Sequence, residues 1–195
     1  FSDCSNLSHV SINNANVKIG NYAFTRCSNL TNISLGNSVI SIGLGSFTYT
    51  KWYNNQPNGL LYLDKYCLGY KETKPSGTLE IKNDVEVIAN SAFKDCSNLK
   101  NVIMPSSLKT IGDDAFNNCS MLNDITIPST VSKIGENAFM NSGWYNIQKD
   151  GILYLNNCCV GYKGEMPSEL TLKNDTRLVA ASAFYSCTKL KSVTI

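Results

Sequence analysis

The fold of this chain is decided by residues 99–121, which read LKNVIMPSSLKTIGDDAFNNCSM, because most other segments are copies or variants of this stretch. A shift of twenty-three residues places Phe93 on Phe116 and Phe116 on Phe139. Self-similarity at a fixed period of this length is typical of a solenoid, in which each unit packs on its neighbours. The sequence therefore predicts a solenoid of stacked repeat units.

The first half of each unit has the pattern L-x-x-I-x-I/L, which alternates apolar and polar residues. In one unit, Ile125 and Ile127 would point to one side of a strand, and Asp124 and Thr126 to the other. Pro128 follows directly, and proline cannot donate a hydrogen bond to a strand ladder. The pattern predicts a short, half-buried strand that ends at the proline.

The second half of each unit reads V/L-x-x-I-G-x-x-A/S-F, often followed by x-x-C. Val131 and Ile134 form an apolar pair, and Gly135 suits a tight backbone corner. The acidic residue after this glycine favours a single helical turn before Phe139. Stacked units would align their apolar side chains in internal columns, with phenylalanine as the deepest. We expect one right-handed solenoid domain over residues 1–195, built from short parallel strands and short helical turns.

Two segments interrupt the period, at about residues 48–75 and 140–167. They contain the related sequences WYNNQPNGLLYLDKYCLGYK and WYNIQKDGILYLNNCCVGYK. Each has an Asn-Gly or Asp-Gly turn dipeptide and then two apolar runs around a short turn. We predict an aromatic β-hairpin unit in each segment.

The complete pattern, LxxIxIPxxVxxIGxxAFxxC, resembles the BspA-like, or treponemal, class of leucine-rich repeats, and its best copies are residues 99–119 and 122–139. The resemblance implies a surface-exposed or secreted binding protein, often bacterial, that adheres to host proteins or to other cells. The copies depart from the pattern at five positions: Gly36 replaces the proline, Ala89 and Ala180 replace the glycine, and Thr50 and Ser142 replace the cysteine.

The charge is balanced, with 17 Lys and Arg against 15 Asp and Glu, so no basic stripe is present for nucleic acid. No run of eighteen apolar residues is present, and we expect no membrane insertion. The first residues lack the pattern of a signal peptide. Because the chain begins and ends within repeats, we expect it to be a fragment of a longer protein.

Five of the eight cysteines follow a phenylalanine by three residues: Cys4, Cys27, Cys96, Cys119 and Cys187. We expect a column of small buried thiols, a common role of free cysteine. Equivalent side chains in stacked units project in parallel, which disfavours bridges between neighbours, and the spacings typical of zinc ligands are absent. Cys158 has no counterpart in the other hairpin segment, so we expect it to be an exposed thiol.

Catalysis has few candidate residues. The single histidine, His9, lies in the first partial repeat, where a nucleophilic dyad or triad would have to form at the edge of the array. Phosphate-binding, zinc-protease, serine-hydrolase and calcium-loop motifs are absent from the sequence. We predict that the chain is not an enzyme and needs no cofactor or metal.

In each unit, the strand in the first half has side chains that point outward, and together these side chains form one candidate binding surface. An extended concave sheet is the common binding surface of solenoids. The residues of this face are His9, Ser11, Asn32, Ser34, Thr78, Glu80, Asn101, Ile103, Asp124, Thr126, Glu169, Thr171, Ser192 and Thr194. The alternative is that small polar residues are present only because they tolerate a solvated strand.

The hairpin segments form a second candidate surface, because Trp and Tyr are favoured hot-spot residues at interfaces. The two segments hold most of the Trp and Tyr residues of the chain: Trp52, Tyr53, Tyr62, Tyr66, Tyr70, Trp144, Tyr145, Tyr154 and Tyr162. The candidate binding residues among them are Trp52, Tyr53, Trp144 and Tyr145. They could contact a protein or stack on a sugar ring. Alternatively, they refill the core where the column cysteine is missing and hold the hairpin against the repeats.

The lack of catalytic motifs favours a non-catalytic chain, and the family resemblance implies an extracellular binding or adhesion module of a bacterial cell-surface or secreted protein. Its expected partner is a protein of the host or of a neighbouring cell, or a glycan. Two other functions stay open: a structural spacer, and a carbohydrate-binding accessory region of a larger enzyme. The oligomeric state is not predicted.

Overall fold

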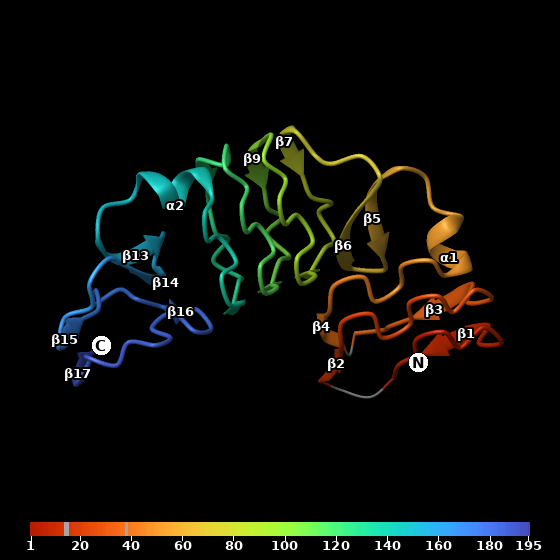
Figure 1. Cartoon of the computed structure of the whole chain (residues 1–195), viewed down its shortest axis with the longest axis horizontal. Coiled ribbons are helices and arrows are strands. Elements are labelled where there is room, and N and C mark those ends of the chain that lie inside the picture. The colour runs from red at the N-terminus through yellow and green to blue at the C-terminus, as the bar shows by residue number, and fades with distance from the viewer. Residues whose placement is uncertain (14–15, 38) are drawn as a thin grey trace.

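The computed structural model describes residues 1–13, 16–37 and 39–195. The chain coils into stacked rungs that form an arch, with the N- and C-termini at opposite feet (Figure 1). Each rung contributes one strand to the outside of the arch and one to the inside. The predicted solenoid of stacked repeat units is therefore confirmed, while its right-handed coiling stays a prediction.

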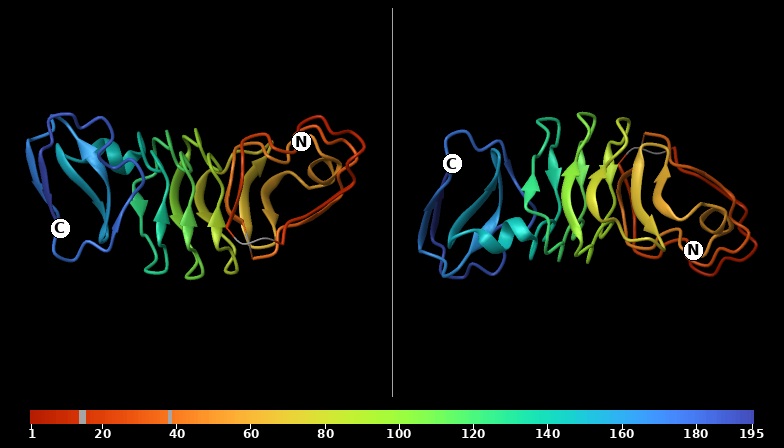
Figure 2. Two further views of the ribbon diagram at one scale, coloured as in Figure 1. Left: turned by 90° about the horizontal axis from the view of Figure 1, so that it is seen from below. Right: turned by 90° about the horizontal axis from the view of Figure 1, so that it is seen from above.

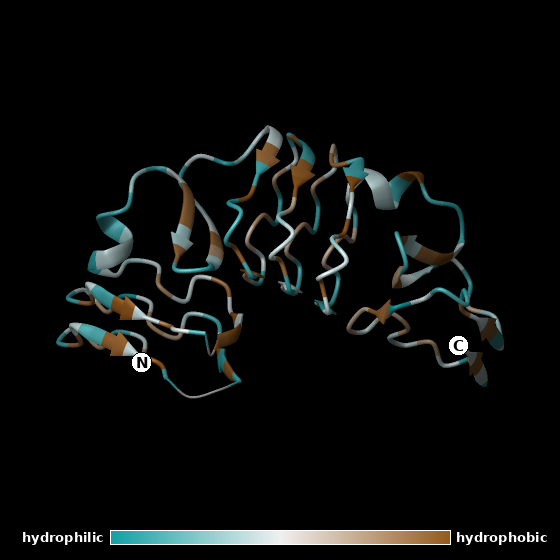
Figure 3. Cartoon of the chain, turned by 180° about the vertical axis from the view of Figure 1, so that it is seen from behind, coloured by the Kyte–Doolittle hydropathy of each residue, from teal (hydrophilic) through white to brown (hydrophobic). Residues whose placement is uncertain are grey.

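The outer strands come from the L-x-x-I-x-I pattern and pair in parallel with the equivalent strand of the next rung. Their bounds are β1 His9–Ser11, β3 Asn32–Ser34, β7 Gly77–Glu80, β9 Leu99–Ile103, β11 Asp124–Ile125, β15 Glu169–Thr171 and β17 Ser192–Thr194. Their apolar residues face the core, as at Leu79, Val102 and Ile125. Hydrophobic and hydrophilic residues both occur along these strands (Figure 3).

The inner strands come from the V/L-x-x-I-G pattern and also pair in parallel. Their bounds are β2 Val17–Ile19, β4 Val39–Ile42, β8 Val87–Ile88, β10 Thr110–Ile111, β12 Lys133–Ile134 and β16 Leu178–Val179. The central rungs stack side by side between the two hairpin units (Figure 2). The regular period thus sets which strands become neighbours.

Phenylalanine rings form the centre of the core. Phe1, Phe24 and Phe47 stack at centroid distances of 5.4 and 5.5 Å. A second run, from Phe93 through Phe116 to Phe139, stacks at 5.3 and 5.6 Å. The column therefore exists within each group of regular rungs and stops where a hairpin unit intervenes.

The helical turn expected before each phenylalanine is wrong. Residues 113–118 form hydrogen-bonded turns, because Asp114 and Asn118 have φ angles of 54° and 59° and left-handed residues interrupt a right-handed helix. The main-chain N–H groups of these residues instead donate to the next rung, for example from Phe116 to the Ala138 carbonyl at 2.8 Å.

Short helices occur elsewhere, at α1 Lys51–Asn54 and α2 Gly143–Ile147 in the hairpin segments. The hydroxyl of Thr50 accepts a hydrogen bond from the Tyr53 N–H at 3.0 Å, and the Ser142 hydroxyl accepts the equivalent bond from Tyr145 at 3.1 Å. Both residues replace the column cysteine because they cap a helix that the regular rungs lack.

Each helix leads into an antiparallel strand pair, β5 Gly59–Leu63 with β6 Tyr66–Lys71 and β13 Gly151–Leu155 with β14 Cys158–Lys163. The second strand of each pair joins the inner strand of the following rung in parallel. A lysine fixes each helix end: the Lys71 ammonium donates to the Tyr53, Asn54 and Gln56 carbonyls at 3.2, 3.0 and 2.7 Å. Lys163 does the same for α2.

The exposed thiol expected at Cys158 is wrong, because its side chain is fully buried. Its counterpart is Tyr66, since both follow the hairpin turn and pair with the next inner strand. The Tyr66 hydroxyl donates to the Gly36 carbonyl at 3.1 Å. In the second unit, the Arg177 guanidinium donates to the equivalent Pro128 carbonyl at 2.9 Å and so replaces the missing hydroxyl.

The arch bends at the hairpin units because extra chain enters on the outside while rungs stay in contact on the inside. The Asn90 N–H donates to the Ile42 carbonyl at 2.8 Å, and the Ala181 N–H donates to Ile134 at 2.9 Å. Helices α1 and α2 lie on the outer side (Figure 1). Each hairpin unit therefore acts as a wedge between two rungs.

Candidate functional site

The outer face consists of the outward side chains of the outer strands, arranged in register. Thr78, Asn101 and Asp124 lie opposite one another on β7, β9 and β11, and Glu80 lies opposite Ile103. The same register joins His9 with Asn32 and Ser11 with Ser34 near the N-terminus, and Glu169 with Ser192 and Thr171 with Thr194 near the C-terminus. All of these side chains are exposed except the half-buried Asn101, and Thr126 beside β11 is exposed as well. The structure thus brings the residues of each rung group into a fixed polar array.

This array lies on the convex side of the arch, so its expected position on a concave sheet is wrong. Strands β1, β3, β7, β9, β15 and β17 lie on the outside in Figure 1, whereas β2, β4 and β16 face the hollow. The repeat sequence could not reveal whether this array lies on the convex or the concave side, because the inserted hairpin units set the direction in which the arch bends.

Polar ladders on the turns also stack from rung to rung, a feature that sequence reasoning missed. The Asn90 side chain accepts from the Asp113 N–H at 3.1 Å, and the Asp113 carboxylate accepts from the Glu136 N–H at 3.0 Å. Nearby, Asn118 donates to Asp95 at 2.9 Å. The recurrence of Asn, Asp or Glu after the Ile-Gly pair is the signal that could have revealed these ladders.

The inner side carries a small charged cluster. The Glu86 carboxylate accepts from Lys65 at 2.8 Å and lies 3.0 Å from the Lys109 ammonium. Burial acts to raise the pKa of Glu86, but hydrogen bonds and charge from the two lysines outweigh it, so this pKa lies below its ordinary value of 4.5. The cluster ties three successive segments together on the inner face.

We expect the Glu86→Gln substitution to destabilise the chain by about 1 kcal/mol at pH 7, because it weakens the interactions with Lys65 and Lys109. The effect stays this small because the Lys109 side chain is exposed and solvent screens its charge. A carboxyl group whose pKa is lower in the folded chain than in the unfolded chain stabilises the fold at any pH above its ordinary pKa. This stabilisation is lost as the pH falls through the pKa of the folded chain. The difference in urea midpoint between wild type and variant should therefore shrink between pH 7 and pH 3. The exposed Glu136→Gln serves as a control, and a difference that grows on acidification would contradict the assignment.

The eight cysteines are all free thiols. Cys27, Cys96 and Cys119 are buried in the predicted column, whereas Cys4 and Cys187 on the terminal rungs are exposed or half-buried. Burial raises the pKa of Cys96 to about 11 and that of Cys119 to about 12. The buried thiols are therefore protonated at neutral pH, and the Cys119 thiol donates to the Phe93 carbonyl at 3.1 Å.

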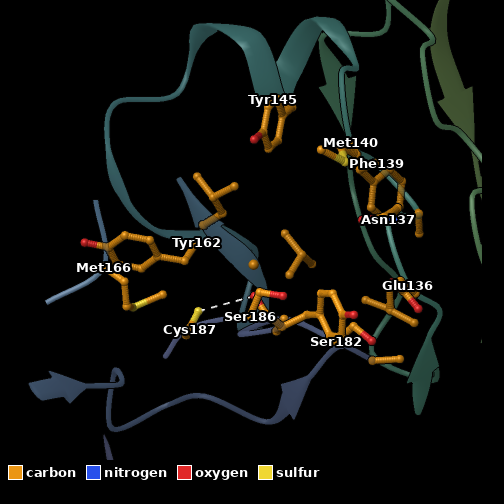
Figure 4. A pocket seen from close by; sticks show the side chains of 18 of the residues that line it. Glu136, Asn137, Phe139, Met140, Tyr145, Tyr162, Met166, Ser182, Ser186 and Cys187 are labelled. Atoms are coloured by element: carbon orange, nitrogen blue, oxygen red, sulfur yellow. Dashed lines mark hydrogen bonds between the residues drawn. The ribbon is translucent and has the colours of Figure 1, made fainter. Parts of the chain in front are cut away.

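A cavity of about 630 Å³ opens where the second hairpin unit separates two rungs, and we call it the C-terminal wedge. One wall is residues 134–140, the other is residues 181–189, and the hairpin residues Leu153, Val160 and Tyr162 line it between them. Tyr145 extends into this space from α2, while Phe139 and Met140 lie at one side and Tyr162 at the other (Figure 4).

A smaller cavity of about 300 Å³ occupies the same place in the first hairpin unit, and we call it the N-terminal wedge. Its walls are residues 42–48 and 89–92, and Leu61, Leu68 and Tyr70 line it between them. Both volumes fall within the range of small ligand pockets. The duplicated cavities were not anticipated from the sequence.

The aromatic candidates line these wedges. Trp52 and Tyr53 line the N-terminal wedge, and Trp144 and Tyr145 line the C-terminal wedge. The Trp52 ring stands edge-on to Phe47 at a centroid distance of 6.2 Å. Both tryptophans are half-buried and pack on the hydrophobic core. They therefore continue the core beyond the last phenylalanine and also form a wall of each cavity.

His9 is exposed, and its Nδ1 lies 3.3 Å from the Ser8 hydroxyl. Among residues 1–13, 16–37 and 39–195, no group of three or more His, Cys, Asp or Glu side chains is placed to hold a metal ion. Within the same residues, neither short helix is long and apolar enough to cross a membrane.

A family model described as "BspA type Leucine rich repeat region" matches this chain in six copies, over residues 1–73 and 62–190. No curated protein matches the chain. Solved structures similar to it include the pneumococcal vaccine antigen PcpA, with 16% identity, a TM-score of 0.43, and coverage of 89% of this chain and 47% of that one.

Two further similar structures are a leucine rich cell surface protein from Faecalibacterium prausnitzii A2-165 and a leucine-rich repeat protein from Bacteroides ovatus ATCC 8483. The identities are 22% and 20%, and the TM-scores are 0.39 and 0.34. Each comparison covers 99% of this chain and 56% of the other protein. The chain thus spans about half the length of these three solved proteins.

Proposed function

Since this chain belongs to the BspA-type leucine-rich repeat family, we propose that it is a non-catalytic, extracellular module that binds a protein on a host cell or a neighbouring cell. The proposal includes a single right-handed solenoid domain over residues 1–195, interrupted by the two hairpin units. In this function the chain holds polar side chains at fixed positions for a partner and adheres through them.

The outer face is the observation that carries this proposal. On β7, β9 and β11 the side chains of Thr78, Asn101 and Asp124 stand in parallel register, each on a strand whose other side is buried. Such an array loses little backbone conformational entropy when it binds, because the sheet already holds the backbone in place. The exposed Ile103 adds apolar area in the middle of the array.

We expect a variant with both Asn101→Arg and Thr126→Arg to lose at least about tenfold in cell binding, because two large charged side chains would stand where a partner must approach. Flow cytometry with the fluorescently labelled chain measures binding to epithelial cells and to cells of other bacteria. A matched control carries Thr130→Arg and Ser132→Arg, which add the same charge at exposed positions outside the outer strands of the same rung group. Equal binding by the two variants would reject the outer face as the binding surface.

A further inference from the structure

The edges of both wedges are rungs whose main-chain ladder has stopped. In regular rungs, the N–H groups of Asp114, Phe116 and Asn118 donate to carbonyls of the next rung at 2.8, 2.8 and 2.9 Å. The corresponding groups at the C-terminal wedge belong to Asn137, Phe139 and Asn141. Within the described part of the chain, these three N–H groups have no hydrogen-bond acceptor.

The unpaired edge keeps the backbone conformation of a paired one. Asn137 and Asn141 have φ angles of 53° and 57°, close to the 54° and 59° of Asp114 and Asn118. Asn137 and Phe139 line the cavity. The donors are therefore preformed to receive another rung, with no change of backbone needed.

The first hairpin unit repeats this arrangement in a narrower form. Its edge residues are Gly45, Phe47 and Tyr49, whose N–H groups likewise have no acceptor among the described residues. Here a Cβ added at Gly69 would collide with the Ala92 carbonyl oxygen, so the hairpin lies tight against the far wall. At the second unit a Cβ on Gly161 would be 3.9 Å from the Ala183 carbonyl oxygen, which leaves the C-terminal wedge open.

The residue at the glycine position of the rung after each hairpin agrees with a displaced neighbouring rung. In regular rungs, the glycine of the Ile-Gly pair is needed because a Cβ at Gly112 would lie 2.6 Å from the backbone of Ala89 and Asn90 in the preceding rung. The rungs that follow the hairpins have Ala89 and Ala180 at this position. Alanine is tolerated there because the hairpin displaces the preceding rung.

We propose that the C-terminal wedge binds a short segment of a partner protein, which acts as an added rung. Main-chain carbonyl groups of this segment accept hydrogen bonds from Asn137, Phe139 and Asn141. One apolar or aromatic side chain of the segment enters the cavity beside Trp144.

A peptide is the occupant favoured by the geometry. The three donors come from alternate residues of a turn, and a peptide in the same turn conformation presents carbonyl groups at alternate residues in the same direction, as Glu136, Ala138 and Met140 do toward the preceding rung. Addition of a chain segment to an open backbone edge, with a pocket that selects a side chain, is a general mode of peptide recognition. The site is separate from the outer face, so this inference and the proposed function can fail independently.

The probe is the acetylated and amidated peptide GENAFMNS, a copy of residues 135–142. In the chain itself, the Glu136, Ala138 and Met140 carbonyls of this segment accept from the equivalent donors of the preceding rung. The measurement is a ¹H–¹⁵N NMR titration of the labelled 195-residue chain. We expect saturable shifts of the Asn137, Phe139 and Asn141 amides, while the Asp114, Phe116 and Asn118 amides stay unchanged. No such shifts at about 1 mM peptide would overturn the proposal.

Two variants test the cavity. Ala183→Trp and, separately, Val160→Trp fill it, and we expect each to weaken peptide binding at least about tenfold. Thr126→Trp adds the same side chain on the outer face and should leave binding unchanged. The second filling variant keeps the test decisive if the first fails to fold. Unchanged binding in a folded filling variant, or shifts produced by chitotetraose and not by the peptide, would overturn the proposal.

Amide hydrogen exchange gives a readout that needs no ligand. The unpaired Asn137, Phe139 and Asn141 amides should exchange about a hundredfold faster than those of Asp114, Phe116 and Asn118, because only the latter are held in the ladder. Addition of the peptide should slow the first set. Equal protection of both sets in the free chain would overturn the open-edge assignment.

Discussion

Replacing Phe116 with alanine should destabilise the central rungs by about 3 to 5 kcal/mol, the cost of removing a buried phenyl group from a packed core. Its side chain is 0% exposed and stacks between Phe93 and Phe139 at 5.3 and 5.6 Å. Because each rung packs mainly on the two adjacent rungs, removal of the central ring weakens the rungs on both sides. The measurement is the shift of the thermal and urea unfolding midpoints by circular dichroism.

Phe1→Ala is the matched control for this prediction. Phe1 stacks on Phe24 at 5.4 Å, but its side chain is 78% exposed at the end of its column. Its removal opens no enclosed cavity, so the midpoint should change little. A Phe116→Ala midpoint equal to that of wild type would refute the columnar core.

The substitution Gly112→Ala should cost about 2 to 3 kcal/mol, because the added methyl group cannot be accommodated by movement of a flexible side chain. A Cβ at this position would lie 2.6 Å from the carbonyl carbon of Ala89 and the nitrogen of Asn90. The preceding rung would have to move, which strains a close-packed interior. Unfolding midpoints and amide exchange at Ile111 and Ile134 would report this change.

Gly20→Ala tests whether the cost comes from the neighbouring rung. Gly20 occupies the same repeat position, yet a Cβ there meets no atom within 4 Å. Alanine should be neutral at this site or stabilise the chain by about 0.5 kcal/mol, because it restricts the unfolded chain. Equal losses for the two variants would mean that the glycine is required for its own backbone conformation and not for contact between rungs.

Local features of the candidate site were predictable because they depend on neighbours in the repeat. The alternation around Ile125 and Ile127 correctly placed Asp124 and Thr126 on a solvent-facing side. The buried thiols at Cys96 and Cys119 followed from their fixed distance after phenylalanine. The prediction of a helical turn before phenylalanine failed because residues such as Asp114 and Asn118 were interpreted as helix-start residues, whereas Asp and Asn also tolerate the left-handed backbone found there.

The burial of Cys158 was missed because the prediction looked only for a matching cysteine, whereas alignment of the two hairpin segments places Cys158 on Tyr66. The strand register shows that the two residues occupy equivalent buried positions. The compensating guanidinium of Arg177 reaches a carbonyl 49 residues away. Such exchanges between two different side chains are visible only when both contacts are seen in space.

The sequence by itself determined the stacked units, the family, the phenylalanine column and the places where the period breaks, because contacts about twenty-three residues apart repeat along the chain. Tertiary structure alone decided that the polar face lies on the convex side and that each hairpin unit leaves a cavity beside an unpaired edge. The physical reason is that the hairpin units add residues, including α1 and α2, on the outer side of the arch, while the rungs on either side stay hydrogen-bonded on the inner side at Ile42 and Ile134. Curvature and gaps depend on both.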